Sequence, residues 1–470
     1  MADLLTLGAA QLVREIRLGA VTPLEVVDAH IARIESVNSS INAMVTPLFE
    51  EARKQAQNAG KRVRKGNDDL PPLFGLPVTV KDSLAVQGVR FTGGSALYRD
   101  HIAGSDAGAV QRLKSAGAII LGKTNCTEMS ASVETENPVF GLTRNPWNLE
   151  CSAGGSSGGE GALIAAGGSP LGLAADIAGS IRIPSALCGV VGLKPTPGRI
   201  PNDGHLPVAP AGVATWNTVG PMARRVEDLV LALSVLSKTP VTPCAALALR
   251  GRRAIVPRFL PVPSPSREIA AGVRKAAAAL ADAGMGVEEG RKLPMVRAVA
   301  EAAGLLYREW LPAIRSDLGG GRPVPVLRSL FSSWLGKAKI APSVLAGLSA
   351  LTVMGPVLGL LRHPRPSGLD QLRLEILEAM GPGGLLLWPV LAAVAPHHGF
   401  ARTPTGMPFY TGIFNALGFP AVSVPVGLSE SGLPVGVQII GRPGEDETAL
   451  AAAAMIEKAS GGWRPAPLPS

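Results

Sequence analysis

The sequence predicts an α/β fold in which helices cover both faces of a central β-sheet. Two observations carry this prediction. Short apolar runs bounded by glycine or proline alternate with helix-like segments from residue 73 to about residue 240, and such runs are typical of buried strands. The chain has 470 residues, of which 46% are hydrophobic, so it can bury a large core without metals or disulfides.

Local patterns place the individual elements. Residues 3–60 are predicted to form two amphipathic helices, and the second opens with Thr22-Pro23-Leu24-Glu25, a capping box with proline at the first helical position. Residues 76–80 are predicted to form a strand that leads into Lys81. The further expected elements are helices at 106–117, 160–166, 267–284 and 447–459 and strands at 118–121, 420–426 and 435–440.

Composition excludes several classes of protein. The net charge is +9, but the basic residues are spread along the chain and only 4% of residues are aromatic, so we expect no nucleic-acid partner. The four cysteines lack metal-ligand spacing, and the N-terminus lacks the features of a signal peptide. These observations predict a cytoplasmic protein with reduced thiols. His397 and His398 have no carboxylate motif beside them, so we expect them in a loop, with no metal site and no cofactor.

Residues 324–362 differ from the rest of the chain. Ile340 to Leu361 is a stretch of 22 residues without a charge, which on length alone could span a bilayer. Pro342 and Pro356 interrupt it, so two short apolar helices broken near the prolines are expected. Three interpretations are open: burial in the protein, contact with a membrane surface, or the wall of a channel for a lipid-like substrate.

Two small-residue turns present serines. Gly154 to Gly159 places Ser156 and Ser157 among four glycines immediately before a predicted helix, and Ile177-Ala178-Gly179-Ser180 forms the second turn. Backbone N–H groups at a helix start suit an anion or a developing oxyanion. A flexible linker is the alternative, but apolar helix and strand patterns flank the first turn. A phosphate loop is a weaker alternative, because the lysine and the Ser/Thr that close GxxxxGK[ST] are missing.

These turns belong to a set of motifs that resembles the amidase signature family, and most closely its fatty-acid amide hydrolase branch. The matching segments, in the order of the family, are Val78–Asp82, Gly122–Asn125, Asn145–Asn148, Cys151–Gly198, Gly220–Arg224 and Leu433–Gln438. The resemblance implies a single large α/β domain at residues 66–470 with a mixed central sheet. It also implies an N-terminal helical region at 1–65, a candidate surface for a homodimer, and a cap-like apolar insertion at 324–362 that could reach a membrane.

The resemblance assigns roles to individual residues. It implies that Lys81 is the base, that Ser156, after a cis peptide bond, relays the proton, and that Ser180 is the nucleophile. The other implied positions are Ser157 as the alternative relay, the backbone N–H groups of Ile177, Ala178, Gly179 and Ser180 as the oxyanion hole, Asp176 and Arg182 as supports of the turn, and Glu128 and Ser130 near the substrate amide. Such a lysine must be buried, because a solvated amine is protonated at neutral pH and cannot act as a base.

The function implied is hydrolysis of a small linear carboxylic amide, with an apolar acyl or aryl group, through an acyl-enzyme on Ser180. Three alternatives are open. The first is an acyltransferase that uses the same acyl-enzyme, and the second is the glutaminase subunit of a tRNA-dependent amidotransferase. The third is a catalytically silent binding protein with Ala178 as the lesion, because most relatives have glycine at this position.

Overall fold

A computed structural model of the chain describes residues 4–64, 69–244, 247–334, 339–360, 368–403 and 408–468. The strands are β1 (Met44–Pro47), β2 (Pro77–Lys81), β3 (Ile119–Thr124), β4 (Glu136–Asn137), β5 (Gly141–Leu142), β6 (Arg144–Asn145), β7 (Asn148–Ser152), β8 (Leu171–Asp176), β9 (Val191–Lys194), β10 (Thr218–Ala223), β11 (Arg253–Pro257), β12 (Gly286–Arg291), β13 (Leu385–Pro389), β14 (Ala421–Leu428) and β15 (Pro434–Ile440).

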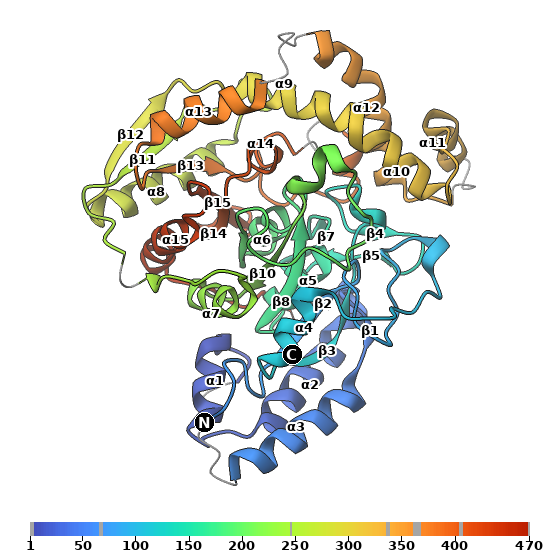
Figure 1. The fold of residues 1–470 in the computed structure, drawn as a ribbon, viewed down its shortest axis with the longest axis vertical. Coiled ribbons are helices and arrows are strands. Elements are labelled where there is room, and N and C mark those ends of the chain that lie inside the picture. Colours follow the sequence, from blue (N-terminus) through green and yellow to red (C-terminus); the bar gives the residue numbers. More distant parts are fainter. Residues whose placement is uncertain are drawn as a thin grey trace.

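The helices are α1 (Ala9–Arg17), α2 (Pro23–Ile41), α3 (Phe49–Arg64), α4 (Gly108–Ser115), α5 (Gly158–Ala165), α6 (Arg182–Cys188), α7 (Val226–Leu236), α8 (Arg267–Asp282), α9 (Met295–Leu305), α10 (Leu311–Leu318), α11 (Val326–Trp334), α12 (Pro342–Leu360), α13 (Gly368–Met380), α14 (Gly412–Ala416) and α15 (Asp446–Ser460). Helices α1–α3 lie at one end of the molecule and α9–α13 at the opposite end (Figure 1).

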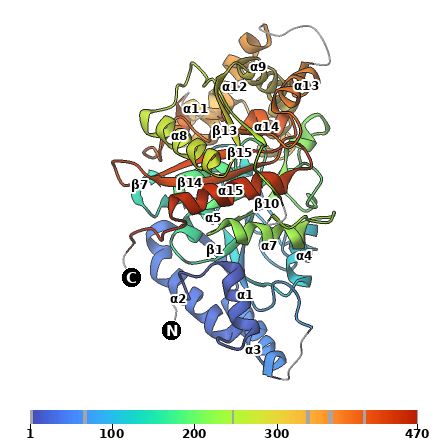
Figure 2. The ribbon, with the colours of Figure 1, turned by 90° about the vertical axis from the view of Figure 1, so that its left-hand side faces the viewer.

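Within the described residues, eleven strands form one mixed sheet in the order β1-β3-β2-β8-β10-β9-β14-β15-β13-β11-β12. Alternate side chains of each strand face opposite layers. In β2, Val78 and Val80 pack into the same cluster as α1, α4, α7, α8 and α15, and α7, α8 and α15 lie in front of the sheet in Figure 2. The opposite face packs against α2, α5, α13 and α14. The predicted α/β class, with helices on both faces of a mixed sheet, is therefore confirmed.

The capping box at the start of α2 is confirmed, because the Thr22 side chain accepts a hydrogen bond from the Glu25 backbone N–H and the Glu25 carboxylate accepts one from the N–H of Thr22. The prediction of two helices over 3–60 is wrong in detail. Strand β1 and helix α3 follow α2, and β1 pairs with β3 at the edge of the sheet. Pairing of two protomers through this region stays a prediction.

The prediction for the apolar insertion is also corrected. Helix α12 begins at Pro342, in agreement with the boundary expected near that proline, but it runs as one element through Pro356 to Leu360, where a second break was expected. Buried contacts of Val344, Leu345 and Leu348 hold the first half of the helix in place, and such packing overrides local preference. Of residues 324–362, the segments 335–338 and 361–362 lie outside the described residues. No described helix is both long and apolar enough to cross a membrane, and contact with a membrane surface stays a prediction.

Candidate active site

Lys81 and the turn that carries Ser180 meet at the same edge of the sheet. Strands β2 and β8 are parallel neighbours, so their carboxyl ends lie side by side. Val78 and Val80 face one layer, and the alternation of a strand therefore turns Lys81 toward the other layer, where α5 and the glycine–serine loop lie. The Lys81 side chain is fully buried. Its Nζ lies 2.7 Å from Ser156 Oγ and 3.3 Å from Ser130 Oγ.

Burial changes the protonation of this amine. Removal from water lowers the pKa of Lys81 from its ordinary value to about 8, although Cys126, Asp176 and Glu160 act in the opposite direction. Burial raises the pKa of Glu160 to about 7, against the hydroxyl donors of Thr79 and Thr124. A lysine with this pKa is partly neutral near physiological pH and can accept a proton.

The glycine–serine loop distinguishes its two serines. The peptide bond between Gly155 and Ser156 is cis, as the family resemblance implied. A side chain at Gly155 would place its Cβ 2.7 Å from the backbone N of Glu134, so only glycine fits this close approach. Ser157 Oγ donates to the carbonyl oxygen of Ala175 at 3.4 Å and makes no hydrogen bond with Lys81 in the described part of the chain. Ser156 is therefore the serine that the lysine contacts.

Ser180 follows β8 at the end of a tight turn. The carboxylate of Asp176 accepts hydrogen bonds from the backbone N–H groups of Gly179 at 2.7 Å and Ile181 at 3.1 Å, which closes the turn. Gly179 has a φ of 126°, where glycine is strongly favoured. Ser180 is 6% exposed. Among the described residues its hydroxyl has no hydrogen-bond partner, Ser156 included.

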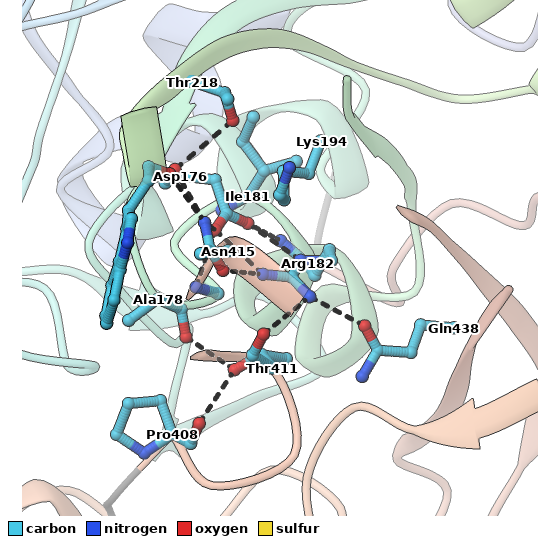
Figure 3. Close-up of polar contacts among 12 residues, drawn as sticks. Asp176, Ala178, Ile181, Arg182, Lys194, Thr218, Pro408, Thr411, Asn415 and Gln438 are labelled. Carbon is cyan, nitrogen blue, oxygen red and sulfur yellow. Dashed lines mark hydrogen bonds and ion pairs between the residues drawn. The ribbon is translucent and has the colours of Figure 1, made fainter. Parts of the chain in front are cut away.

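A network of buried hydrogen bonds stabilises the turn that carries Ser180 (Figure 3). Arg182 donates to both carboxylate oxygens of Asp176 at 3.0 Å, and both side chains are fully buried. Burial alone would raise the pKa of Asp176, but the Arg182 guanidinium and the Asn415 amide hold it well below its ordinary value. Arg182 also donates to the carbonyl oxygen of Thr411 at 3.1 Å and to Gln438 at 2.8 Å. The expected supporting residues thus share one network.

The four backbone N–H groups expected to form an oxyanion hole are not equivalent. That of Gly179 donates to Asp176, while those of Ile177, Ala178 and Ser180 have no acceptor among the described residues. Ala178 is absent from the positive-φ residues, so its methyl group imposes no backbone strain. The Ala178 carbonyl accepts from Thr411 Oγ1 at 2.6 Å. The backbone conformation at Ala178 therefore gives no reason to expect that this residue makes the protein catalytically silent.

Ser180 opens onto a cavity with uncharged walls. The described residues that line it are Ser130, Ala131, Ser132, Val133, Ile177, Ala178, Ser180, Leu306, Trp310, Gly347, Leu351, Ala401 and Pro408. Ser130 connects this cavity to Lys81, since its hydroxyl is the second acceptor of the amine. The nucleophile candidate and Ser130, which Lys81 contacts, thus border one space, and that space favours apolar groups.

Glu128 does not line this cavity. Its carboxylate is almost fully buried and accepts the backbone N–H of Ala341 at 2.8 Å, immediately before α12 begins. Burial raises the pKa of Glu128 to about 7. Of the two residues expected near the substrate amide, Ser130 lies at the cavity, and Glu128 instead ties the start of α12 to the turn that carries Ser130.

We expect Glu128→Leu to loosen the start of α12 and Glu128→Gln to preserve it. Leucine leaves the N–H of Ala341 buried without an acceptor, which costs about 1–3 kcal/mol, whereas the glutamine carbonyl can still accept. Hydrogen–deuterium exchange of peptides covering 339–351 measures this difference. Equal exchange in the leucine variant and the wild-type protein would contradict the assignment.

Several residues of the site were not identified from the sequence. Glu160, Thr411 and Asn415 were not singled out, although Glu160 stands within the glycine–serine segment and Asn415 contacts Asp176 at 2.9 Å. The cavity walls from η5 (Leu306–Trp310) and α12 were also missed individually. The only local signal was the apolar character of 324–362. His397 and His398 lie between β13 and the short helix at Phe400–Arg402, in a loop as expected.

Comparisons with known proteins show which family and fold the whole chain shares. A family model described as Amidase matches residues 25–450. Fatty-acid amide hydrolase 2-A of Danio rerio is 37% identical, with 98% of this chain and 90% of the relative covered. A glutamyl-tRNA(Gln) amidotransferase subunit of Roseiflexus sp. (strain RS-1) is 35% identical, with 92% of each covered. The solved structure of 6-aminohexanoate cyclic dimer hydrolase complexed with substrate has a TM-score of 0.79 and 30% identity, with 98% of each chain covered.

Proposed function

The chain belongs to the amidase family, and we propose that it hydrolyses linear amides of apolar carboxylic acids through an acyl-enzyme on Ser180. The observation that carries this proposal is the 2.7 Å contact between the buried Lys81 amine and Ser156 Oγ, since the same amine contacts Ser130, which lines the cavity of Ser180. A serine hydroxyl is a weak nucleophile and needs such a base within reach.

The first half of the reaction forms the acyl-enzyme. The neutral Lys81 amine takes the Ser156 proton while Ser156 takes the proton of Ser180, and Ser180 Oγ then attacks the amide carbon. The contact between Ser156 and Ser180 forms when substrate binds, since catalytic hydrogen bonds are often long in a free enzyme. The N–H groups of Ile177, Ala178 and Ser180 stabilise the oxyanion.

The second half releases both products. The proton returns from Lys81 through Ser156 to the amide nitrogen as the carbon–nitrogen bond breaks, because an amide anion leaves poorly. Water then loses a proton to the same relay and attacks the acyl carbon, which frees the carboxylic acid and restores the Ser180 hydroxyl. The uncharged walls of the cavity favour an apolar acyl or aryl group.

Covalent labelling tests the proposal directly. A fluorophosphonate is expected to add one phosphonyl group to Ser180 of the wild-type protein, located by mass spectrometry of peptides. Ser180→Ala is expected to take up none, and Ser157→Ala is expected to label at a rate close to wild type. Labelling that persists in Ser180→Ala, or a wild-type protein that neither labels nor hydrolyses any apolar amide, would overturn the assignment.

A glutaminase role has one observation in its favour, the 35% identity to the amidotransferase subunit of Roseiflexus sp.. The cavity argues against it, because none of its described lining residues carries a charge for the ammonium and carboxylate groups of free glutamine. Ammonia release from glutamine, compared with release from a long-chain primary amide, distinguishes the two functions. An acyltransferase would instead yield a new amide when a second amine is added.

A further inference from the structure

Helix α12 contributes a glycine to the wall of the Ser180 cavity. Gly347 and Leu351 stand one helical turn apart and both line the cavity, so they share one face of the helix. The buried residues Val344, Leu345 and Leu348 fix this part of α12 against the rest of the protein. Helix α12 lies beside α9 and α10 at this end of the molecule (Figure 1), and Leu306 and Trp310, between those two helices, line the same cavity.

Neither helix geometry nor close packing requires glycine at position 347. Its φ is not positive, and glycine inside a helix is less stable than alanine. Apart from its own helix, a Cβ atom built on Gly347 would meet one described neighbour within 4 Å, the carbonyl oxygen of Ala131 at 3.9 Å. Gly155 is different, since a Cβ there would lie against backbone atoms at 2.7 Å. Open space lies in front of Gly347, and that space is the cavity.

We propose that Gly347 determines how long an acyl group the cavity accepts. The inference rests on the proposed function and specifies its substrate class: amides whose unbranched apolar acyl chain extends from Ser180 past the Cα of Gly347, between α12 and the side chains of Leu306 and Trp310. A side chain at position 347 projects into this path. Shortening Leu351, on the same face one turn further along, removes atoms from it.

The test compares acyl lengths in full-length variants. The rates of hydrolysis of acetyl, hexanoyl and dodecanoyl p-nitroanilides are to be measured for the wild-type protein and for Gly347→Ala, Gly347→Leu and Leu351→Ala. We expect Gly347→Leu to lower the ratio of kcat/KM for dodecanoyl over acetyl substrate by about 10- to 200-fold, the range for small volume changes in an apolar pocket. Gly347→Ala should lower it less, and Leu351→Ala should shift the preference toward the longer chain. Ala346→Leu, half-buried on the same helix but outside the cavity, should leave the ratio unchanged.

A binding measurement tests the role of Gly347 independently of catalytic activity. Dodecanamide and acetamide are titrated into Ser180→Ala protein with and without Gly347→Leu, and thermal unfolding confirms that each variant is folded. Weaker binding of dodecanamide alone supports the role of Gly347 even if the wild-type protein proves inactive, in which case only the proposed function fails. An unchanged dependence on chain length in Gly347→Leu, in both assays, would overturn the inference.

Discussion

Lys81→Met is expected to lower kcat/KM by about 10²- to 10⁴-fold, the contribution typical of a positioned general base. Methionine keeps much of the length of the side chain but cannot accept the Ser156 proton. Ser156→Ala should cost a similar factor, because no described hydrogen bond joins Lys81 directly to Ser180. The double variant should lose no more than either single variant, since residues that act as a unit are strongly non-additive.

The pH profile provides a second measure of the same lysine. Only the unprotonated amine is a base, and burial lowers the pKa of Lys81 to about 8. The wild-type kcat/KM should therefore rise about tenfold per pH unit below 8 and level off above it. This limb should disappear in Lys81→Met. Ser157→Ala serves as the matched control, because its hydroxyl contacts the carbonyl of Ala175 instead. Two results would contradict the relay. One is a double variant of Lys81 and Ser156 whose loss of kcat/KM is the product of the two single losses. The other is a pH dependence below 8 that persists in Lys81→Met.

Much of the site could be predicted because its residues stand in contiguous motifs. Side chains alternate between the two faces of a strand, so Val78 and Val80 of β2 share one face and Lys81 lies on the other. The choice between Ser156 and Ser157 depends on the register of a glycine-rich loop, and the residues alone left both open. The structure decides between the two, since Ser156 contacts the amine and Ser157 contacts the carbonyl of Ala175 instead.

Other features depend on contacts between distant segments. Asn415 and Gln438 meet Arg182 across more than 200 residues of chain, and nothing in their local sequence indicates such a partner. Strand β1 has only four residues and gains its stability by pairing with β3. The helical patterns on both sides of this short segment therefore led to the prediction of helix alone.

Arg182→Met is expected to lower the free energy of unfolding by about 3–5 kcal/mol, the cost of breaking a buried ion pair by removal of one partner. The Asp176 carboxylate would stay buried without its counter-charge, and Gln438 would lose a donor. Arg297→Met provides the matched control. Its ion pair with Glu375 has the same 3.0 Å separation, but both side chains are 38% exposed, and pairs of this kind contribute at most about 1 kcal/mol. Urea denaturation followed by fluorescence measures both variants.

Acid should remove the same stabilisation from the wild-type protein. The pKa of Asp176 in the folded state lies below its unfolded value of about 4. The contribution of the carboxylate is therefore fully present above pH 4 and is lost as the pH falls toward the folded-state pKa. In Arg182→Met the guanidinium that lowers this pKa is absent, so the difference in stability between variant and wild type should shrink below pH 4. A difference that stays constant from pH 7 to pH 3, or a loss no greater than that of Arg297→Met, would show that this ion pair does not stabilise the turn of Ser180.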